Sequence, residues 1–247
     1  ACAVYVEQPN SFGLLDPGLC ELKPMIGENT ALIVGVQPVS LGLVAPPGDY
    51  GADIVVGEGQ PFGIGPTAGG PIYGLFACSE AYIRQMPGRI VGLSKDSDGE
   101  RAFTLTLSTR EQHIRRHRAT SNICSNETLI ALMGAMHMAL LGPGGLEKLA
   151  QRNAGACSAT KSALLALDEV ELVHPNGSHF NEFAIRLPRP AADLLSFLDD
   201  ECDITGGLDL SQWWPERENE LLVCATDQID IEDIEELAEG IQDWLEG

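Results

Sequence analysis

Lysine is scarce in this chain of 247 residues, which has only four lysines, Lys23, Lys95, Lys148 and Lys161. None of them follows an apolar strand in a polar context, so none marks a catalytic site. The GxSxG, HExxH and P-loop patterns are also absent, which excludes the usual motifs of serine hydrolases, zinc peptidases and P-loop NTPases. Any functional residues of this chain must therefore lie outside these motifs.

Paired cysteines are missing as well. The seven cysteines are odd in number, widely spread and never spaced as CxxC. This excludes a disulfide framework and the common zinc sites, and we expect reduced thiols in a cytoplasmic protein without a bound metal.

Long apolar runs are absent too. No run reaches the roughly 18 residues that a membrane helix needs, and no signal peptide pattern is present. We therefore expect no membrane contact. The sequence does not begin with Met, and Ala1 to Val6 already has the composition of a buried strand. We expect a fragment whose N-terminal part is missing.

Positive charge is in short supply, and its distribution is uneven. The chain has 36 acidic and 15 basic residues, giving a formal net charge of −21. Residues 193–247 hold 18 acidic residues and a single basic one, Arg217. Such a surface argues against nucleic-acid binding, which needs cations to neutralise phosphates. We favour a solvated surface suited to a salty or crowded cytoplasm over an acidic docking face.

Short apolar runs in the first half predict strands at Ala1–Val6, Ala31–Val36, Ala52–Val56, Gly74–Cys78 and Phe103–Leu107. Their near-continuous apolar character is typical of a sheet covered on both faces, and the pattern predicts an α/β fold. The Gly57–Gly63 segment has the spacing GxGxxxG. Because prolines and further glycines prevent a helix from opening there, we reject a dinucleotide site and expect the glycines to allow close backbone approach or turns with positive φ.

Two helices are expected next. Leu129, Met133, Met136 and Leu140 share one helical face, which we assign to the core together with a packed His137. Gly142-Pro143-Gly144 ends this helix, and a second one covers Leu146–Leu167.

After residue 168 we expect a strand at Asn181–Leu187, a helix at Ala191–Asp200, a strand at Glu220–Ala225 and a helix at Ile231–Leu245. Trp213 and Trp214 are assigned to packing. The chain is thus divided into part of a large α/β domain (1–145), a bridging helix (146–167) and a small α+β domain (168–247).

The candidate functional stretch runs from Ser108 to Ser125, where four of the fifteen Lys and Arg residues fall within nine positions. Guanidinium groups beside a helix N-terminus suit a carboxylate or phosphate. A solvated basic loop or ion pairs within the fold would explain the same pattern. The candidates are Arg110, His113, Arg115, Arg116 and the helix-capping residues Thr120, Ser121 and Asn122. Cys124 could act as a nucleophile with a nearby histidine, but we favour a packed thiol.

Several strings resemble the glycine decarboxylase P-protein family. They are Gly57–Gly63 (GEGQPFG), Arg84–Gly92 (RQMPGRIVG), Thr109–Arg116 (TREQHIRR), Ala119–Cys124 (ATSNIC), Leu141–Leu146 (LGPGGL), Phe180–Phe183 (FNEF) and Glu220–Cys224 (ELLVC). They span the chain, and within the family they are most similar to the C-terminal part of the first, or α, subunit of the two-subunit form.

The resemblance implies an aspartate aminotransferase-like fold, the type I fold of pyridoxal-phosphate enzymes, with the large domain truncated at its N-terminus and a small C-terminal domain. In that fold a lysine after a strand forms the Schiff base, and here Gln60 stands in its place. An aspartate at the end of an earlier strand holds the pyridine nitrogen, and here that strand end is Val34-Gly35.

For function, the resemblance implies a subunit of a complex that decarboxylates glycine and transfers the aminomethyl group to the lipoyl arm of H-protein. A β subunit, in an α2β2 assembly, would bind the pyridoxal 5'-phosphate. We expect the candidate basic residues to lie at the interface, where some would line the entrance or hold the cofactor phosphate. Alternatively, they only keep a vestigial pocket in shape. The alternatives for the chain are a non-catalytic paralogue of the same fold and a free-standing enzyme.

Overall fold

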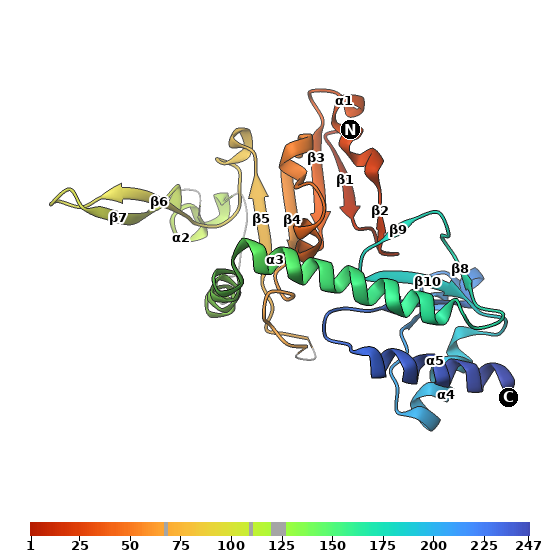
Figure 1. The fold of residues 1–247 in the computed structure, drawn as a ribbon. Coiled ribbons are helices and arrows are strands. Elements are labelled where there is room, and N and C mark those ends of the chain that lie inside the picture. The colour runs from red at the N-terminus through yellow and green to blue at the C-terminus, as the bar shows by residue number, and fades with distance from the viewer. Residues whose placement is uncertain (67–68, 109–110, 120–126) are drawn as a thin grey trace.

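The computed structural model describes residues 1–66, 69–108, 111–119 and 127–247 (Figure 1). Within these residues the chain forms two four-stranded sheets, which are joined by one long helix, and two smaller two-stranded sheets.

The first sheet has the strand order β1-β3-β4-β5. The first three strands are parallel and β5 runs antiparallel to β4. The strands are β1 (Ala3–Gln8), β3 (Ala31–Val36), β4 (Ile54–Glu58) and β5 (Gly74–Cys78). The predictions for β3 and β5 are confirmed to the residue, and β1 and β4 begin two residues later than predicted.

Coverage of this sheet differs from the prediction. Leu32 and Val34 of β3 are fully buried, but Tyr5 of β1 is 54% exposed and Phe76 of β5 is 38% exposed. The expectation of a sheet covered on both faces is therefore wrong for the described residues. An apolar run indicates that a strand is shielded from water. It does not indicate which other part of the protein or of a complex packs against the strand.

The run at Phe103–Leu107 forms a strand outside this sheet. It lies in β7 (Arg101–Thr106), which pairs only with β6 (Ile90–Lys95) in an antiparallel hairpin. The hairpin projects away from the rest of the molecule (Figure 1). Asp96 sets its turn, because one carboxylate oxygen accepts from the backbone N–H groups of Asp98 and Glu100 at 2.9 and 3.0 Å.

The long helix α3 (Thr128–Leu164) combines the two predicted helices. Gly142 interrupts it with φ 61° and ψ −179°, so the predicted break is confirmed. The assignment of Leu129, Met133, Met136 and Leu140 to the core is wrong, because these side chains are 45% to 86% exposed. Periodicity located the apolar face of the helix correctly, but the opposite face of the helix packs against the rest of the protein.

By length and composition α3 is apolar enough to cross a membrane, contrary to the expectation that no segment would be. Core helices of soluble proteins meet the same criterion when they are mostly buried, whereas only 6% of the apolar window of α3 is buried. The kink at Gly142 interrupts the helix, and Leu146 and Leu149 beyond it pack against a protein core.

The second sheet, with the order β11-β12-β10-β8, is antiparallel. Two helices pack with it, so the predicted strand, helix, strand, helix order is confirmed. The elements are β8 (Glu171–Leu172), β10 (Glu182–Arg186), α4 (Ala191–Cys202), β11 (Leu208–Asp209), β12 (Glu220–Cys224) and α5 (Ile231–Glu246). Apart from these, β2 (Leu14–Leu15) pairs with β9 (Ser178–His179).

Two core clusters result. One surrounds the second sheet and includes Phe183, Leu194 and Trp244 together with Cys157 and Leu164 of α3. The other contains Val39, Phe62, Ala150 and Phe180. Because α3 enters both, the proposed boundaries at 145 and 167 stay a prediction.

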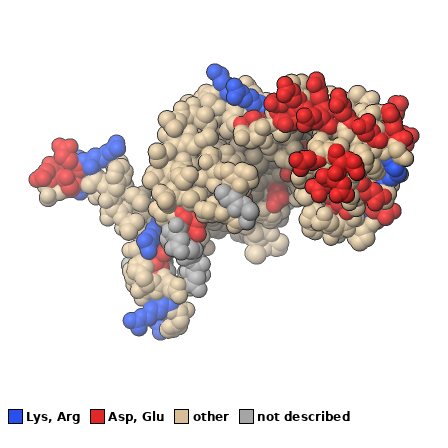
Figure 2. All heavy atoms as spheres, turned by 90° about the horizontal axis from the view of Figure 1, so that it is seen from below, with Lys and Arg blue, Asp and Glu red and all other residues tan. Residues whose placement is uncertain are grey.

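Acidic side chains gather over the C-terminal part of the molecule (Figure 2). In α5, Asp230 caps the helix by accepting from the N–H groups of Glu232 and Asp233. Negative charge at a helix N-terminus is favourable, so the acidic composition is locally compatible with this helix.

The tryptophan pair is less buried than predicted, with Trp213 56% and Trp214 39% exposed. Trp214 does pack, since its ring lies 5.6 Å from the Phe12 ring and beneath the Arg217 guanidinium. Trp213 packs in turn on Trp214, with ring centres 6.4 Å apart, so the assignment to packing holds although both rings are partly exposed.

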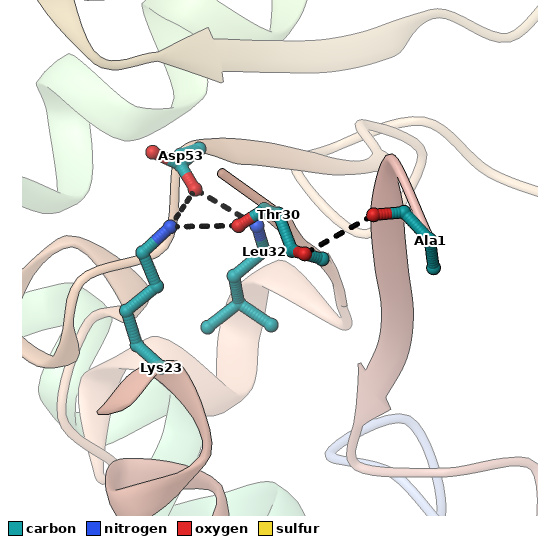
Figure 3. Close-up of polar contacts among 5 residues, drawn as sticks. All are labelled: Ala1, Lys23, Thr30, Leu32 and Asp53. Atoms are coloured by element: carbon teal, nitrogen blue, oxygen red, sulfur yellow. Dashed lines mark hydrogen bonds and ion pairs between the residues drawn. The ribbon is translucent and has the colours of Figure 1, made fainter. Parts of the chain in front are cut away.

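A half-buried ion pair ties the first sheet together at the start of its strands (Figure 3). Lys23 of α1 (Leu22–Ile26) donates to Asp53 Oδ2 at 2.5 Å and to the Thr30 carbonyl at 3.0 Å. The same Asp53 oxygen accepts from the Leu32 N–H at 2.8 Å. Burial alone would raise the pKa of Asp53, but the contacts with Lys23 and Leu32 outweigh it and hold that pKa below its usual value.

We expect Asp53→Asn to lower the free energy of unfolding by about 1 to 2 kcal/mol at neutral pH, because the Lys23 ammonium loses its charged acceptor. The lowered pKa means that this contribution is complete above the unfolded-state pKa of about 4 and is lost as the pH falls through the folded-state pKa. Urea unfolding at pH 7 and at lower pH measures both effects. The exposed Asp49→Asn is the control, and an equal loss in both variants would contradict the assignment.

Candidate functional site

A hollow of about 420 Å³ lies at the carboxyl ends of the parallel strands. Tyr5 and Glu7 come from β1, Gly35 from β3, Glu58 from β4 and Glu182 from β10. In open α/β sheets, ligands bind outside the carboxyl ends of the strands, which makes this hollow the first place to look for a site.

The hollow is acidic. Glu7, Glu58 and Glu182 line it, and none of the described residues that line it is a lysine or arginine. The Tyr5 hydroxyl donates to Glu7 Oε1 at 2.7 Å, and this hydrogen bond, together with burial and the Glu7 charge, raises the pKa of Tyr5. Burial also raises the pKa of Glu182. A phosphate group placed here would meet carboxylates rather than cations.

The Gln60 loop follows β4, in the place predicted for it. Gln60 sits between Glu58 and Pro61, which both line the hollow. Its amide nitrogen lies 3.5 Å from the Gly65 carbonyl oxygen, a long contact. An amide cannot form an imine with an aldehyde, so this loop offers no Schiff base. That Gln60 stands at the position of the Schiff-base lysine of this fold stays a prediction.

Gly35 closes the other side of the hollow. A Cβ atom at this position would collide with the Tyr5 hydroxyl and come within 3.1 Å of Glu7 Cγ. No carboxylate side chain could therefore extend from position 35 unless Tyr5 moved. With no lysine, no carboxylate at position 35 and no cation for a phosphate, the residues that line this hollow do not fit pyridoxal phosphate.

Tyr73 fixes the Gln60 loop, and the sequence pattern did not reveal this. Its ring lies against Gly59 and its hydroxyl against Gly134 of α3, where a Cβ atom would overlap the side chain in each case. The Gly59 N–H donates to the Tyr73 carbonyl at 2.7 Å. The hydroxyl has no hydrogen-bond partner among the described residues, and burial raises its pKa. The glycines are thus needed for close approach, as expected for Gly59.

His137 behaves as a packed histidine. It is partly buried, and a Cβ atom at Gly63 would come within 2.8 Å of its Nδ1 atom. Its Nε2 atom is buried without a partner among the described residues.

The basic stretch is placed away from the hollow. His113 and Arg115 lie in α2 (Gln112–Arg115), and Arg116 begins a 3-10 helix that ends at Arg118. All three side chains are exposed, and none lines the hollow. Arg110, Thr120, Ser121, Asn122 and Cys124 lie outside the described residues, so their predicted roles stay predictions.

Arg116 has an unusual backbone, with φ 55° and ψ −126°. A non-glycine residue in this region costs on the order of 1 to 3 kcal/mol, and such residues cluster at functional sites. Within the described residues, no ion pair involves Arg115, Arg116 or Arg118. The reading of this stretch as a set of internal ion pairs therefore has no support in the described part of the chain.

Comparison with known proteins gives the family. The model of the glycine cleavage system P-protein family matches residues 1–240. A relative from Rhizorhabdus wittichii, the probable glycine dehydrogenase (decarboxylating) subunit 1, is 47% identical over 244 residues, covering 97% of this chain and 53% of its own length. The chain thus spans about half the length of the curated relatives it matches.

Solved structures agree. A crystal structure of glycine decarboxylase (P-protein) of the glycine cleavage system, in inhibitor-bound form, has a TM-score of 0.90 at 38% identity and covers 98% of this chain and 54% of that one. A NifS-like protein from Rickettsia africae, at 14% identity and a TM-score of 0.67, covers 99% of this chain and 62% of that one. The second likeness shows the fold alone, and the predicted type I pyridoxal-phosphate fold is confirmed.

Both the family model and the structural likeness extend over almost the whole chain, through the Gln60 loop and the basic stretch alike. This chain belongs to the glycine cleavage system P-protein family.

Proposed function

We propose that this chain acts as the α subunit of a glycine decarboxylase. Together with a β subunit it decarboxylates glycine and transfers the aminomethyl group to the lipoyl arm of H-protein. Family membership and the subunit 1 name of a relative support this reading. Nothing in the comparisons favours the alternative of a non-catalytic paralogue.

The acidic hollow is the observation that supports assigning the cofactor chemistry to a second subunit. Among the described residues its lining offers neither a lysine nor another cation, and Tyr5 as placed obstructs a side chain at position 35. A chain of this family with such a hollow needs a second subunit for the cofactor chemistry. We therefore assign pyridoxal 5'-phosphate and the Schiff-base lysine to the β subunit, in an α2β2 complex that works in the cytoplasm. The cysteines described as free thiols agree with that compartment.

The basic stretch is assigned to the interface between the two subunits. His113, Arg115 and Arg116 are exposed, and Arg116 is held in a strained conformation. Exposed guanidinium groups that form no ion pair with the described residues are available to carboxylates or phosphates of a partner. The same assignment covers Arg110, Thr120, Ser121 and Asn122.

Reconstitution tests the proposed function. The chain at its natural length is mixed with its β subunit, pyridoxal phosphate and H-protein, and exchange of labelled bicarbonate into glycine is followed. We expect exchange only in the mixture, because neither subunit alone holds a complete site. Exchange by this chain alone would overturn the division of labour, and exchange by the β subunit alone would support the paralogue alternative.

Gln60→Ala should change the exchange rate of the mixture by less than about twofold, because an amide that cannot form a Schiff base takes no part in the proposed chemistry. The loop itself is held by Tyr73, so the substitution leaves its backbone in place. A loss of tenfold or more would show that the hollow contributes to turnover after all.

Arg115→Ala combined with Arg116→Ala should weaken assembly with the β subunit by about tenfold or more, because two interfacial cations are removed. Sedimentation velocity measures assembly, and the effect should shrink at high salt. Arg152→Ala, which removes an exposed arginine of α3, is the matched control. Equal assembly of the double variant and the control would place the basic stretch outside the interface.

A further inference from the structure

A small two-stranded sheet connects the two four-stranded sheets. β2 follows β1 of the first sheet, β9 precedes β10 of the second, and the two short strands pair antiparallel with Leu14 opposite His179 (Figure 1). The Phe180 N–H donates to the Gly13 carbonyl at 3.0 Å beside this pair. These contacts hold the segment after β1 to the second sheet. We call β2, β9 and the turn at residues 174–177 the clasp.

Two histidines lie in the clasp with ring nitrogens that have no partner. Both ring nitrogens of His179 and the Nε2 atom of His174 are buried and unbonded among the described residues. The His174 ring lies 5.5 Å from the ring of Phe12, which belongs to the segment after β1. The His179 ring meets the Phe183 ring edge-on at 6.5 Å. Both histidines are therefore part of the packing that joins the two sheets.

Gly177 closes the space beside the His179 ring. A Cβ atom at Gly177 would overlap the Leu14 side chain and come within 3.6 Å of His179 Cε1. The Gly177 N–H is already engaged, because it donates to the His174 carbonyl at 3.1 Å. Since the ring is enclosed by the turn and by β2, its nitrogens reach water only when β9 separates from β2.

The titratable groups that act on His179 are other bases. Lys161 acts on it from α3 and His174 from the turn, while β2 and β10 pack against it with the apolar Leu14 and Phe183. A proton on His179 would thus add a positive charge to a site that already has a cation nearby. Buried charges are tolerated when an opposite charge pairs with them, so the carboxylates decide the outcome.

The carboxylates beside these elements are engaged elsewhere. Asp16, which follows β2, accepts from the Gly18 N–H at 2.8 Å, and Glu182 of β10 lines the acidic hollow. Within the described residues His179 takes part in no ion pair. A charged His179 would therefore lack the partner that could keep it in place.

These surroundings lower the pKa of His179. Burial is the largest cause, and the charges of Lys161 and His174 add to it. A contact with the Gly177 backbone favours the charged form, but it does not reverse the direction. The neutral ring thus stabilises the closed clasp. This contribution is complete above the open-state pKa of about 6.5 and is lost as the pH falls below that value.

We infer that the clasp is a pH-sensitive connection, which opens in mildly acidic solution when His179 takes up a proton and leaves its buried site. Opening releases the segment after β1 from the second sheet. Because Gly13 of that segment packs on the Glu182 carbonyl, opening also loosens one wall of the acidic hollow. The inference goes beyond the proposed function and does not depend on it.

Amide hydrogen exchange detects this opening. It is followed by mass spectrometry on the chain at its natural length, at about pH 7.5 and about pH 5.5, which lie on either side of the histidine pKa. Rates are corrected for the intrinsic pH dependence of amide exchange. Peptides over residues 10–15 and 174–180 report on the clasp, and peptides over β12 report on the second sheet itself.

We expect protection of the wild-type clasp peptides to fall by about five- to tenfold between the two pH values, because an exposed histidine is about 90% protonated at the lower one. His179→Leu should reduce the fall to less than about twofold, since leucine does not titrate. Lys161→Met removes the neighbouring cation and should make the fall smaller. His117→Gln removes an exposed histidine and should behave as wild type.

Other results overturn the inference. Unchanged wild-type protection would show that the clasp stays closed in acid. An equal fall in wild type and His179→Leu would assign the effect to another group, and an equal fall over β12 would mean that the whole second sheet unfolds. If His179→Leu leaves the clasp open at both pH values, Lys161→Met decides, and a fall as large as in wild type would contradict the role of His179.

Discussion

The arrangement of the chain depends on the burial of the second half of α3. Ala150 is fully buried against Val39, Phe62 and Phe180, while Leu164 is fully buried in the core of the second sheet. Between them Asn153, only 3% exposed, donates to the Leu149 carbonyl and to Asp227 at 2.9 and 3.1 Å. A single helix thus fixes both sheets, and a buried amide with both bonds satisfied sets its rotation.

The acidic hollow is a product of that arrangement. Its floor comes from strands of the first sheet, while Glu182 comes from the second. Gly13 brings the segment after β1 into direct contact with β10. It packs on the Glu182 carbonyl with φ 73°, where there is no room for a side chain. The carboxylates of the hollow are therefore brought together by packing between sheets rather than by any local motif.

The sequence allowed the regular elements to be predicted well where they are short and bounded by turn residues. β3, β5 and β12 follow from short apolar runs, and α5 follows from an acidic amphipathic pattern. The sequence could not show that Met133 and Leu140 face outward. Periodicity identifies an apolar helix face, but it does not identify what packs against that face. The place of Gln60 after β4 was predictable from resemblance. The roles of Tyr5 and Tyr73 were not, since both depend on contacts with glycines distant in sequence.

The contact between Tyr5 and Gly35 also bears on how such a chain can change over generations. A substitution that gives position 35 a side chain is obstructed while Tyr5 stays, and a smaller residue at position 5 would leave a gap beside Gly35 and Glu7. A side chain at position 35 therefore requires Tyr5 to rotate away or to be replaced, so the two positions are coupled although they lie on different strands.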